Sequence, residues 1–114
     1  MSKVPTELSK DAKKLLSLSY KEYLVQREQG ANKETAMMLS GGAQGIRDRL
    51  MPETPVEDVA SICWELHDAG YVAAYGANNT VYTATLTNEA IVYMENRLKN
   101  GLLDGLELLS KFVP

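Results

Sequence analysis

The feature that most constrains the fold is a change of hydrophobic period at Gly70. Before it, apolar residues recur at the spacing of one helix face, at Val56, Val59, Ala60, Cys63 and Leu66. After it, the runs 71–76 and 81–86 alternate and are rich in strand-forming residues. Glycine commonly ends a helix because it adopts positive φ without strain. The sequence therefore predicts a helix that leads directly into a two-stranded hairpin.

The start of this helix is marked by the segment Thr54-Pro55-Val56-Glu57. It places a capping threonine before a proline at the first helical position and a glutamate at the third. This is the pattern of a capping box, in which side chains satisfy the free N–H groups of the first turn. We therefore expect the helix to begin at Pro55 with Thr54 as its cap.

The hairpin is expected to turn at Asn78-Asn79, since asparagine tolerates positive φ. A two-residue turn there sets three cross-strand pairs: Tyr75 with Tyr82, Ala73 with Ala84, and Tyr71 with Leu86. All six side chains would then share one face. The predicted hairpin has a buried aromatic side.

Local start and stop signals predict the other helices. Ser9 caps a helix that runs to Gln29 and stops at Gly30, with Lys10, Lys13, Lys14 and Lys21 mostly off its apolar stripe. Asn32 caps a short turn, and a second short helix follows the glycine break at 40–42 and ends before Pro52. Thr87 caps a last helix, whose apolar stripe is Ala90, Ile91, Met94 and Leu98. The chain is thus predicted to be mostly helical, in the α+β class.

Helix, short helix, capped helix, hairpin and helix is the order of elements in a winged-helix domain. The segments "ELHDAGYV" and "TLTNEAIVYMENRL" carry a resemblance of the whole chain to small bacterial and phage-related winged-helix proteins of the YjcQ type. The resemblance implies a compact, non-enzymatic module over residues 1–114, with 88–114 as a C-terminal helical extension. In DNA-binding winged helices the helix before the hairpin enters the major groove.

Composition limits the function classes further. The 114 residues include one cysteine, one histidine and a net charge of −3. A single cysteine excludes an intramolecular disulfide and a multi-cysteine zinc site, and fits a reducing compartment. No apolar run approaches the ~20 residues that cross a bilayer. We therefore expect a cytoplasmic protein with no membrane contact.

The acidic excess is concentrated where a winged helix would read DNA. Residues 53–70 carry a charge of −5 and no lysine or arginine, and 71–86 carry no charged residue. Binding to DNA phosphates requires lysine or arginine at the docked surface. The charge pattern disfavours DNA as a partner, although a DNA-binding regulator that docks through Arg47, Arg49, Lys33 and the first helix remains the alternative.

A protein-interaction role is the preferred hypothesis. The C-terminal tail has more apolar residues than one helix face needs, and its candidate contacts are Leu102, Leu103, Leu106, Leu109 and Phe112. A second copy of the chain could cover them, giving a homodimer, or the tail could fold back on the first helix. Trp64, at the border of the apolar and acidic faces of its helix, is either a partner anchor or a half-buried core residue.

The sequence gives only weak indications of a catalytic, metal-binding or phosphate-binding site. Cys63 and His67 lie four residues apart on a helix, but two ligands do not close a metal site, and Cys63 points into the predicted core. We interpret His67 as a packed, hydrogen-bonded side chain. The glycine-rich segment 40–45 lacks the lysine and spacing of a phosphate-binding loop. No catalytic residue, metal or cofactor is predicted.

Overall fold

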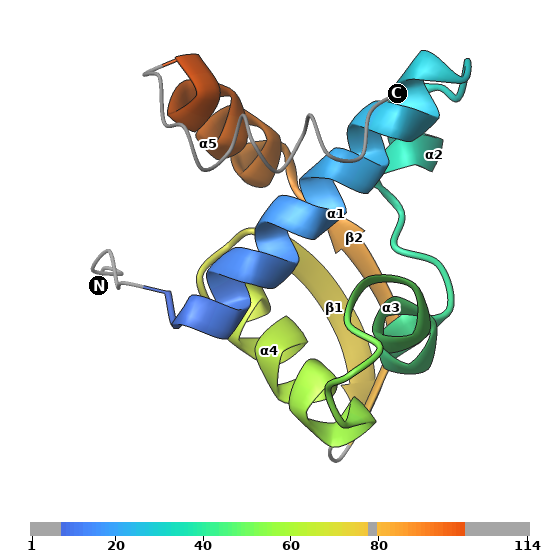
Figure 1. The fold of residues 1–114 in the computed structure, drawn as a ribbon, viewed down its shortest axis with the longest axis vertical. Helices are drawn as coiled ribbons and strands as arrows, with labels where there is room; N and C mark the ends of the chain where they lie inside the picture. Colours follow the sequence, from blue (N-terminus) through green and yellow to red (C-terminus); the bar gives the residue numbers. More distant parts are fainter. Residues whose placement is uncertain (1–7, 78–79, 100–114) are drawn as a thin grey trace.

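The computed structural model describes residues 8–77 and 80–99. It contains five helices and one hairpin within that part of the chain (Figure 1). In chain order the elements are α1 (Lys10–Glu28), α2 (Lys33–Met37), α3 (Gly42–Leu50), α4 (Val56–Asp68), β1 (Val72–Ala77), β2 (Thr80–Leu86) and α5 (Asn88–Lys99). The α+β class is confirmed, and the order of elements is compatible with a winged helix.

Side-chain caps begin three of the helices as expected. The Ser9 hydroxyl accepts from the Ala12 N–H at 3.1 Å, and the Asn32 side chain accepts from the Thr35 N–H at 2.8 Å. Thr87 starts α5 by accepting from the Ala90 N–H and also donates to the Gly70 carbonyl at 2.7 Å. These bonds satisfy N–H groups that have no partner within their own helix.

The predicted capping box before α4 does not form. The structure places Pro55, not Thr54, at the N-cap, and no side chain there accepts from the first turn. The Thr54 carbonyl instead accepts from the Arg47 side chain at 3.2 Å. The end of α4 agrees with the sequence, because Gly70 lies just beyond Ala69 with φ +91°.

The pairing of the strands from Ala77 and Thr80 agrees with the expected position of the hairpin, but the predicted register is wrong beyond the first two pairs. Ala77 faces Thr80 and Gly76 faces Val81, whereas Tyr75 faces Thr83. Tyr82 is therefore the extra residue of a β-bulge. A shift of one residue reverses the face of every later side chain, so the expected buried aromatic side is not present. Tyr75 is 69% exposed and Tyr82 is 65% exposed.

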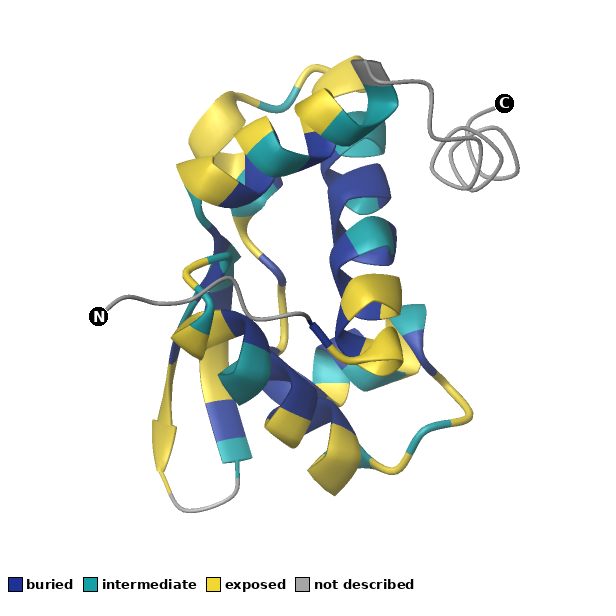
Figure 2. Cartoon of the chain, turned by 90° about the vertical axis from the view of Figure 1, so that its left-hand side faces the viewer, coloured by how far each residue is buried: buried dark blue, intermediate teal, exposed yellow. Residues whose placement is uncertain are grey.

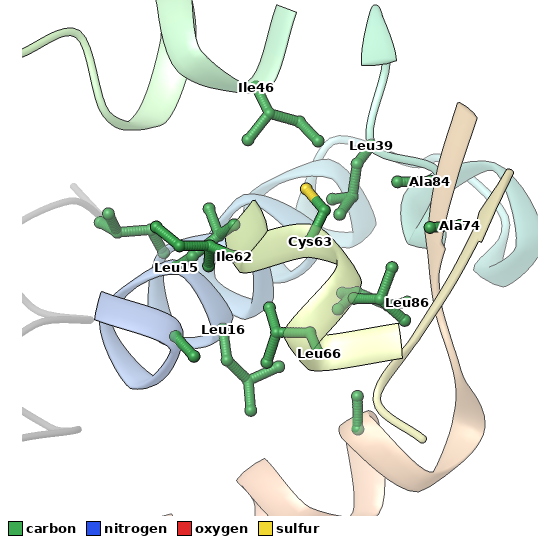
Figure 3. Close-up of a cluster of buried hydrophobic side chains, with 14 of the residues drawn as sticks. Leu15, Leu16, Leu39, Ile46, Ile62, Cys63, Leu66, Ala74, Ala84 and Leu86 are labelled. Atoms are coloured by element: carbon green, nitrogen blue, oxygen red, sulfur yellow. The ribbon is translucent and has the colours of Figure 1, made fainter. Parts of the chain in front are cut away.

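The core lies between α1, the pair α3 and α4, and one face of the hairpin (Figure 3). Its most completely buried side chains include Leu15, Leu16, Ile46, Leu66 and Leu86. Helix α5 packs against α1, with Ala90, Ile91 and Met94 buried as the sequence predicts. Among the described residues, no helix has the length and apolar character that a bilayer span requires.

Candidate interaction surfaces

The two faces of the hairpin differ completely in their surroundings. Helices α3 and α4 lie on one side, which we call the inner sheet face, and bury Val72, Ala74, Ala84 and Leu86 (Figure 1). Met38, just after α2, forms a bridge with Thr85, and the Leu39 N–H donates to the Ala84 carbonyl at 2.9 Å. Residues 38–39 therefore add an isolated bridge to the edge of β2.

The opposite side, which we call the outer sheet face, is formed by Met38, Ala73, Tyr75, Thr83 and Thr85. Paired residues of antiparallel strands project to the same side, and the pairing places these five together. Met38 is 53% exposed and Tyr75 is 69% exposed, and both strands show exposed segments in Figure 2. The face is uncharged and carries large apolar groups. Sequence reasoning missed it because the bulge at Tyr82 has no signal in the sequence.

The bulge is held in place by a close approach from α3. Gly42, with φ +62°, lies so near β2 that a Cβ atom built on it would be 2.5 Å from the Val81 carbonyl oxygen and 2.8 Å from that of Tyr82. Any side chain at this position would push β2 away. The glycine break at 40–42 therefore includes a packing contact at Gly42.

The acidic surface of α4 is smaller than the sequence suggests. Glu57, Asp58 and Asp68 are exposed, but the Glu65 carboxylate accepts from both the N–H and the hydroxyl of Ser9, at 2.7 and 2.8 Å. Glu65 therefore fixes the start of α1 and does not face a partner. The remaining acidic groups still carry no compensating lysine or arginine within α4, so the repulsion expected for DNA phosphates persists.

Trp64 is half-buried, as one of its two predicted roles requires. Its ring meets the imidazole of His67 edge to face, with ring centres 5.4 Å apart. The Nδ1 atom of His67 accepts from the Ala74 N–H at 3.2 Å. The predicted hydrogen bond of His67 is confirmed, although the residue is exposed and not packed in the core.

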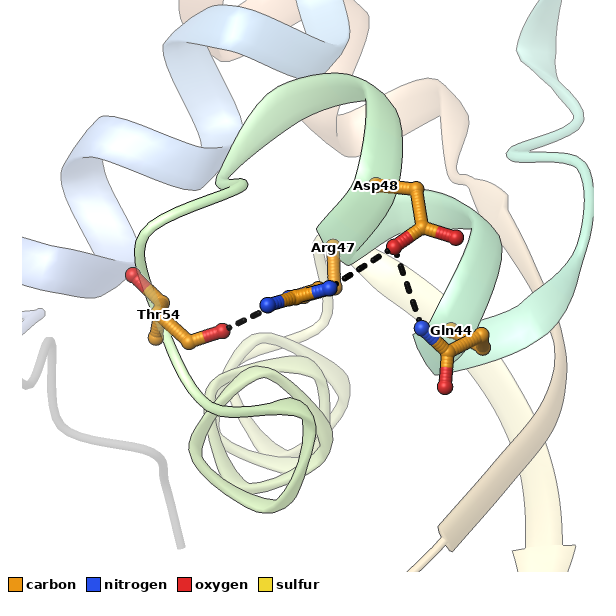
Figure 4. A network of polar contacts seen from close by, with 4 residues as sticks. All are labelled: Gln44, Arg47, Asp48 and Thr54. Atoms are coloured by element: carbon orange, nitrogen blue, oxygen red, sulfur yellow. Dashed lines mark hydrogen bonds and ion pairs between the residues drawn. The ribbon is translucent and has the colours of Figure 1, made fainter.

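Arg47 is engaged in contacts within its own domain. Its guanidinium donates to Asp48 at 3.0 Å and to the Thr54 carbonyl, and Asp48 also accepts from Gln44 (Figure 4). These contacts join α3 to the segment before α4. A phosphate would have to compete with them.

Arg49 and Lys33 also have partners within the chain. Arg49 forms an ion pair with Glu22 at 2.7 Å, and its guanidinium donates to the Ser40 carbonyl at the same distance. Lys33 donates to the Asn88 side chain at 3.0 Å, at the start of α5. The three cations singled out as DNA contacts do not lie on one element, and each contributes to the fold.

The exposed positive charge gathers on the first half of α1. Lys10, Lys13 and Lys14 are exposed, as expected for lysines that mostly lie off the apolar stripe, whereas Lys21 is only 8% exposed. Arg97 of α5 lines a small hollow together with Lys13. Its guanidinium lies 5.5 Å from the centre of the Tyr93 ring.

The pair Cys63 and His67 does not resemble a nucleophile with its base. Cys63 is buried, and burial raises the pKa of its thiol to about 11, so the thiol stays protonated at neutral pH. His67 already uses Nδ1 as an acceptor. Within residues 8–77 and 80–99, no three metal-ligating side chains come together.

The tail contacts expected at Leu102, Leu103, Leu106, Leu109 and Phe112 lie outside the described residues. Comparisons with models of known families, with curated proteins and with solved structures gave no match. The surfaces described above therefore carry the functional argument.

Proposed function

We propose that this chain is a non-enzymatic winged-helix module that acts through protein contacts, and that its outer sheet face forms a homodimer. The observation that carries the proposal is the exposure of Tyr75 and Met38 on a hairpin without charged residues. Exposed apolar groups gathered on one surface are typical of interaction sites. Aromatic residues and methionine are also enriched at protein interfaces.

The winged-helix assignment is supported by the position of the isolated bridge at Met38. Residues 38–39 precede α3, bridge β2, and so join the segment before the helix pair to the hairpin after it. Helices α3 and α4 contact each other and both contact the hairpin. Such contacts are expected where a helix-turn-helix and its wing share one core, so they support the assignment.

A second copy is the partner that suits the outer sheet face best. In a two-fold interface each surface patch meets its own copy. The exposed acidic groups of α4 would repel themselves in such a contact, whereas the uncharged outer sheet face has no charge to repel. Burying Tyr75 and Met38 from both copies would remove four large apolar groups from water.

Sedimentation velocity of the full chain tests this proposal. We expect the wild-type chain to sediment as a dimer and Tyr75→Lys as a monomer, since the substitution places a charge on each side of the interface. Val92→Lys is the matched control, because Val92 is also exposed, at 46%, but lies on α5. Thermal unfolding followed by circular dichroism checks that both variants fold.

Three outcomes would overturn the interface. If the wild-type chain is monomeric at every accessible concentration, it does not form the proposed homodimer. If the Tyr75→Lys chain stays dimeric, the outer sheet face is not the dimer interface. If Leu106→Lys alone produces a monomer, the C-terminal tail is the interface instead.

A second candidate function is DNA-backbone binding through α1. The exposed lysines Lys10, Lys13 and Lys14 favour it, since no ion pair holds them among the described residues. Fluorescence anisotropy with a random duplex at about 50 mM salt would detect such binding. We expect replacement of all three by glutamine to abolish any signal, with Arg47→Gln as the control. An unchanged anisotropy with the wild-type chain would rule this candidate out.

A further inference from the structure

A small hollow lies between α1 and α5, which pack against each other. Its volume of about 10 Å³ is close to the space that one water molecule needs. Leu16 and Met94, which are only 1% and 3% exposed, form its apolar lining. The polar side chains that line it are Lys13, Ser17, Tyr93 and Arg97. The hollow therefore admits one oxygen atom of a ligand whose remaining atoms stay outside.

Two cations and no carboxylate line this hollow. The side chain of Lys13 is exposed and has no hydrogen bond or ion pair with any residue of 8–77 or 80–99. Arg97 lies over the Tyr93 ring and donates to its hydroxyl at 3.2 Å, but this partner is neutral. Burial and the carboxylate of Glu95 raise the pKa of Tyr20, which places Glu95 near the next turn of α1 and outside the lining. A ligand with two negative charges would balance the two cations.

The polar groups of the lining can all donate hydrogen bonds. The Lys13 ammonium has three N–H groups and the Arg97 guanidinium has five, of which the Tyr93 hydroxyl accepts only one. That hydroxyl keeps its own proton to donate, and the Ser17 hydroxyl has no partner among the described residues. A terminal phosphate group offers three acceptor oxygens and nearly two negative charges at neutral pH. It therefore matches both the donors and the charge of the hollow.

We propose that this hollow binds the terminal phosphate group of a phosphate monoester. One phosphate oxygen enters between Lys13 and Arg97, and the ester-linked part of the ligand remains outside. The buried apolar lining lowers the local dielectric constant, which strengthens the charge-assisted hydrogen bonds. The site shares no residue with the outer sheet face. It also differs from the DNA-backbone candidate, because it uses Arg97 in place of Lys10 and Lys14 and selects a dianion over a phosphate diester.

The test uses methyl phosphate as the probe and dimethyl phosphate, a monoanionic diester, as its counterpart. Each is titrated into the full chain at neutral pH and constant ionic strength and followed by amide NMR. We expect methyl phosphate to bind with a Kd of about 1 mM, at least about tenfold more tightly than dimethyl phosphate, with shifts concentrated around 13–17 and 93–97. Equal affinities, no binding of methyl phosphate, or shifts concentrated elsewhere would each overturn the proposal. This comparison needs no variant, so a folding defect cannot obscure it.

Variants then assign the contacts. Lys13→Gln and Arg97→Gln each remove one charge from the lining, and we expect each to weaken methyl phosphate at least about fivefold. Lys14→Gln is the matched control, because Lys14 is an exposed neighbour on the same helix that does not line the hollow. It should change the affinity by less than about twofold. If Lys14→Gln weakens binding as much as Lys13→Gln does, the phosphate responds to the general charge of α1 and the hollow is not its site.

Discussion

The two faces of the hairpin are formed by the same two strands, but one face is buried and the other is exposed. On the inner sheet face, Ala74 and Leu86 are 3% and 1% exposed, because α3 and α4 cover them. On the outer sheet face, Tyr75 is 69% exposed, and none of the helix–hairpin contacts described above reaches it. The largest of these three side chains is thus on the side that contributes least to the core. The inner face contributes to the core, whereas the outer face is exposed.

The largest expected effect is on the inner face. Leu86→Ala removes a side chain that is 1% exposed, and we expect the free energy of unfolding to fall by about 2–5 kcal/mol, because burial is lost and a cavity remains. Urea denaturation measures this change. Thr83→Ala, on the outer face of the same strand, is the control, with an expected change below about 0.5 kcal/mol. Equal losses for the two variants would refute the contrast between the faces.

The second prediction concerns the thiol in the core beneath the inner face (Figure 3). Burial raises the pKa of Cys63 from 9.0 to about 11. The folded chain therefore keeps this proton over a pH range where the unfolded chain loses it, so stability is full below pH 9.0 and declines as pH rises toward about 11. The total loss is of the order of 2–3 kcal/mol.

Urea denaturation between pH 8 and 11, roughly the span of the two titrations, checks this decline. Cys63→Ala should be less stable at neutral pH but should show a shallower dependence on pH than the wild type. Burial also raises the pKa of Tyr20 and Tyr71, so part of the decline remains in the variant. Identical slopes for the two chains would show that Cys63 does not titrate in this way.

The third prediction separates backbone strain from the contact that holds the bulge. Gly42→Ala combines a positive φ with an overlap against the Val81 and Tyr82 carbonyls, whereas Gly30→Ala has φ +102° and nothing within 4 Å. Overpacking costs about 1–3 kcal/mol, so we expect Gly42→Ala to destabilise by that much more than Gly30→Ala. Thermal or urea unfolding compares them. If the two losses are the same, α3 does not hold the bulge.

The smallest effect is expected on the outer face. Tyr75→Ser should change the unfolding free energy of the monomer by less than about 0.5 kcal/mol, since little area is lost from the core. The measurement needs dilute protein, because association would add its own stabilisation. A loss above about 1 kcal/mol would mean that Tyr75 packs within its own chain and that the outer face is not free.

Three helix starts were predictable because the capping side chain and its target N–H lie only three residues apart. Ser9, Asn32 and Thr87 each accept from an N–H three residues later, and each was identified from the sequence alone. Thr54 has the same local signal, but its cap is replaced by a proline cap, and its carbonyl is held by Arg47, seven residues away. A local pattern cannot report a competing contact from another helix.

The candidate surfaces were less predictable for the same reason. One extra residue, Tyr82, moves Tyr75 from the expected buried side to the outer face, and the contact that stabilises the bulge comes from Gly42, about forty residues earlier in the chain. Glu65 belongs to the acidic segment 53–70, yet its carboxylate binds Ser9 across a separation of 56 residues. The sequence shows which segment carries the acidic side chains, but only the packing shows which of them bind other parts of the chain.

The contact between His67 and the Ala74 N–H has a consequence for how this sheet can associate. Ala74 lies on β1, which pairs only with β2 in the described part of the chain. At the free edge of such a strand, an unpaired N–H can donate a hydrogen bond to a strand of another chain. The Ala74 N–H instead donates to the imidazole of His67. At the opposite edge, on β2, the Ala84 carbonyl accepts from the Leu39 N–H. Each edge is therefore capped at one position, which disfavours the addition of a strand from another chain at Ala74 and Ala84.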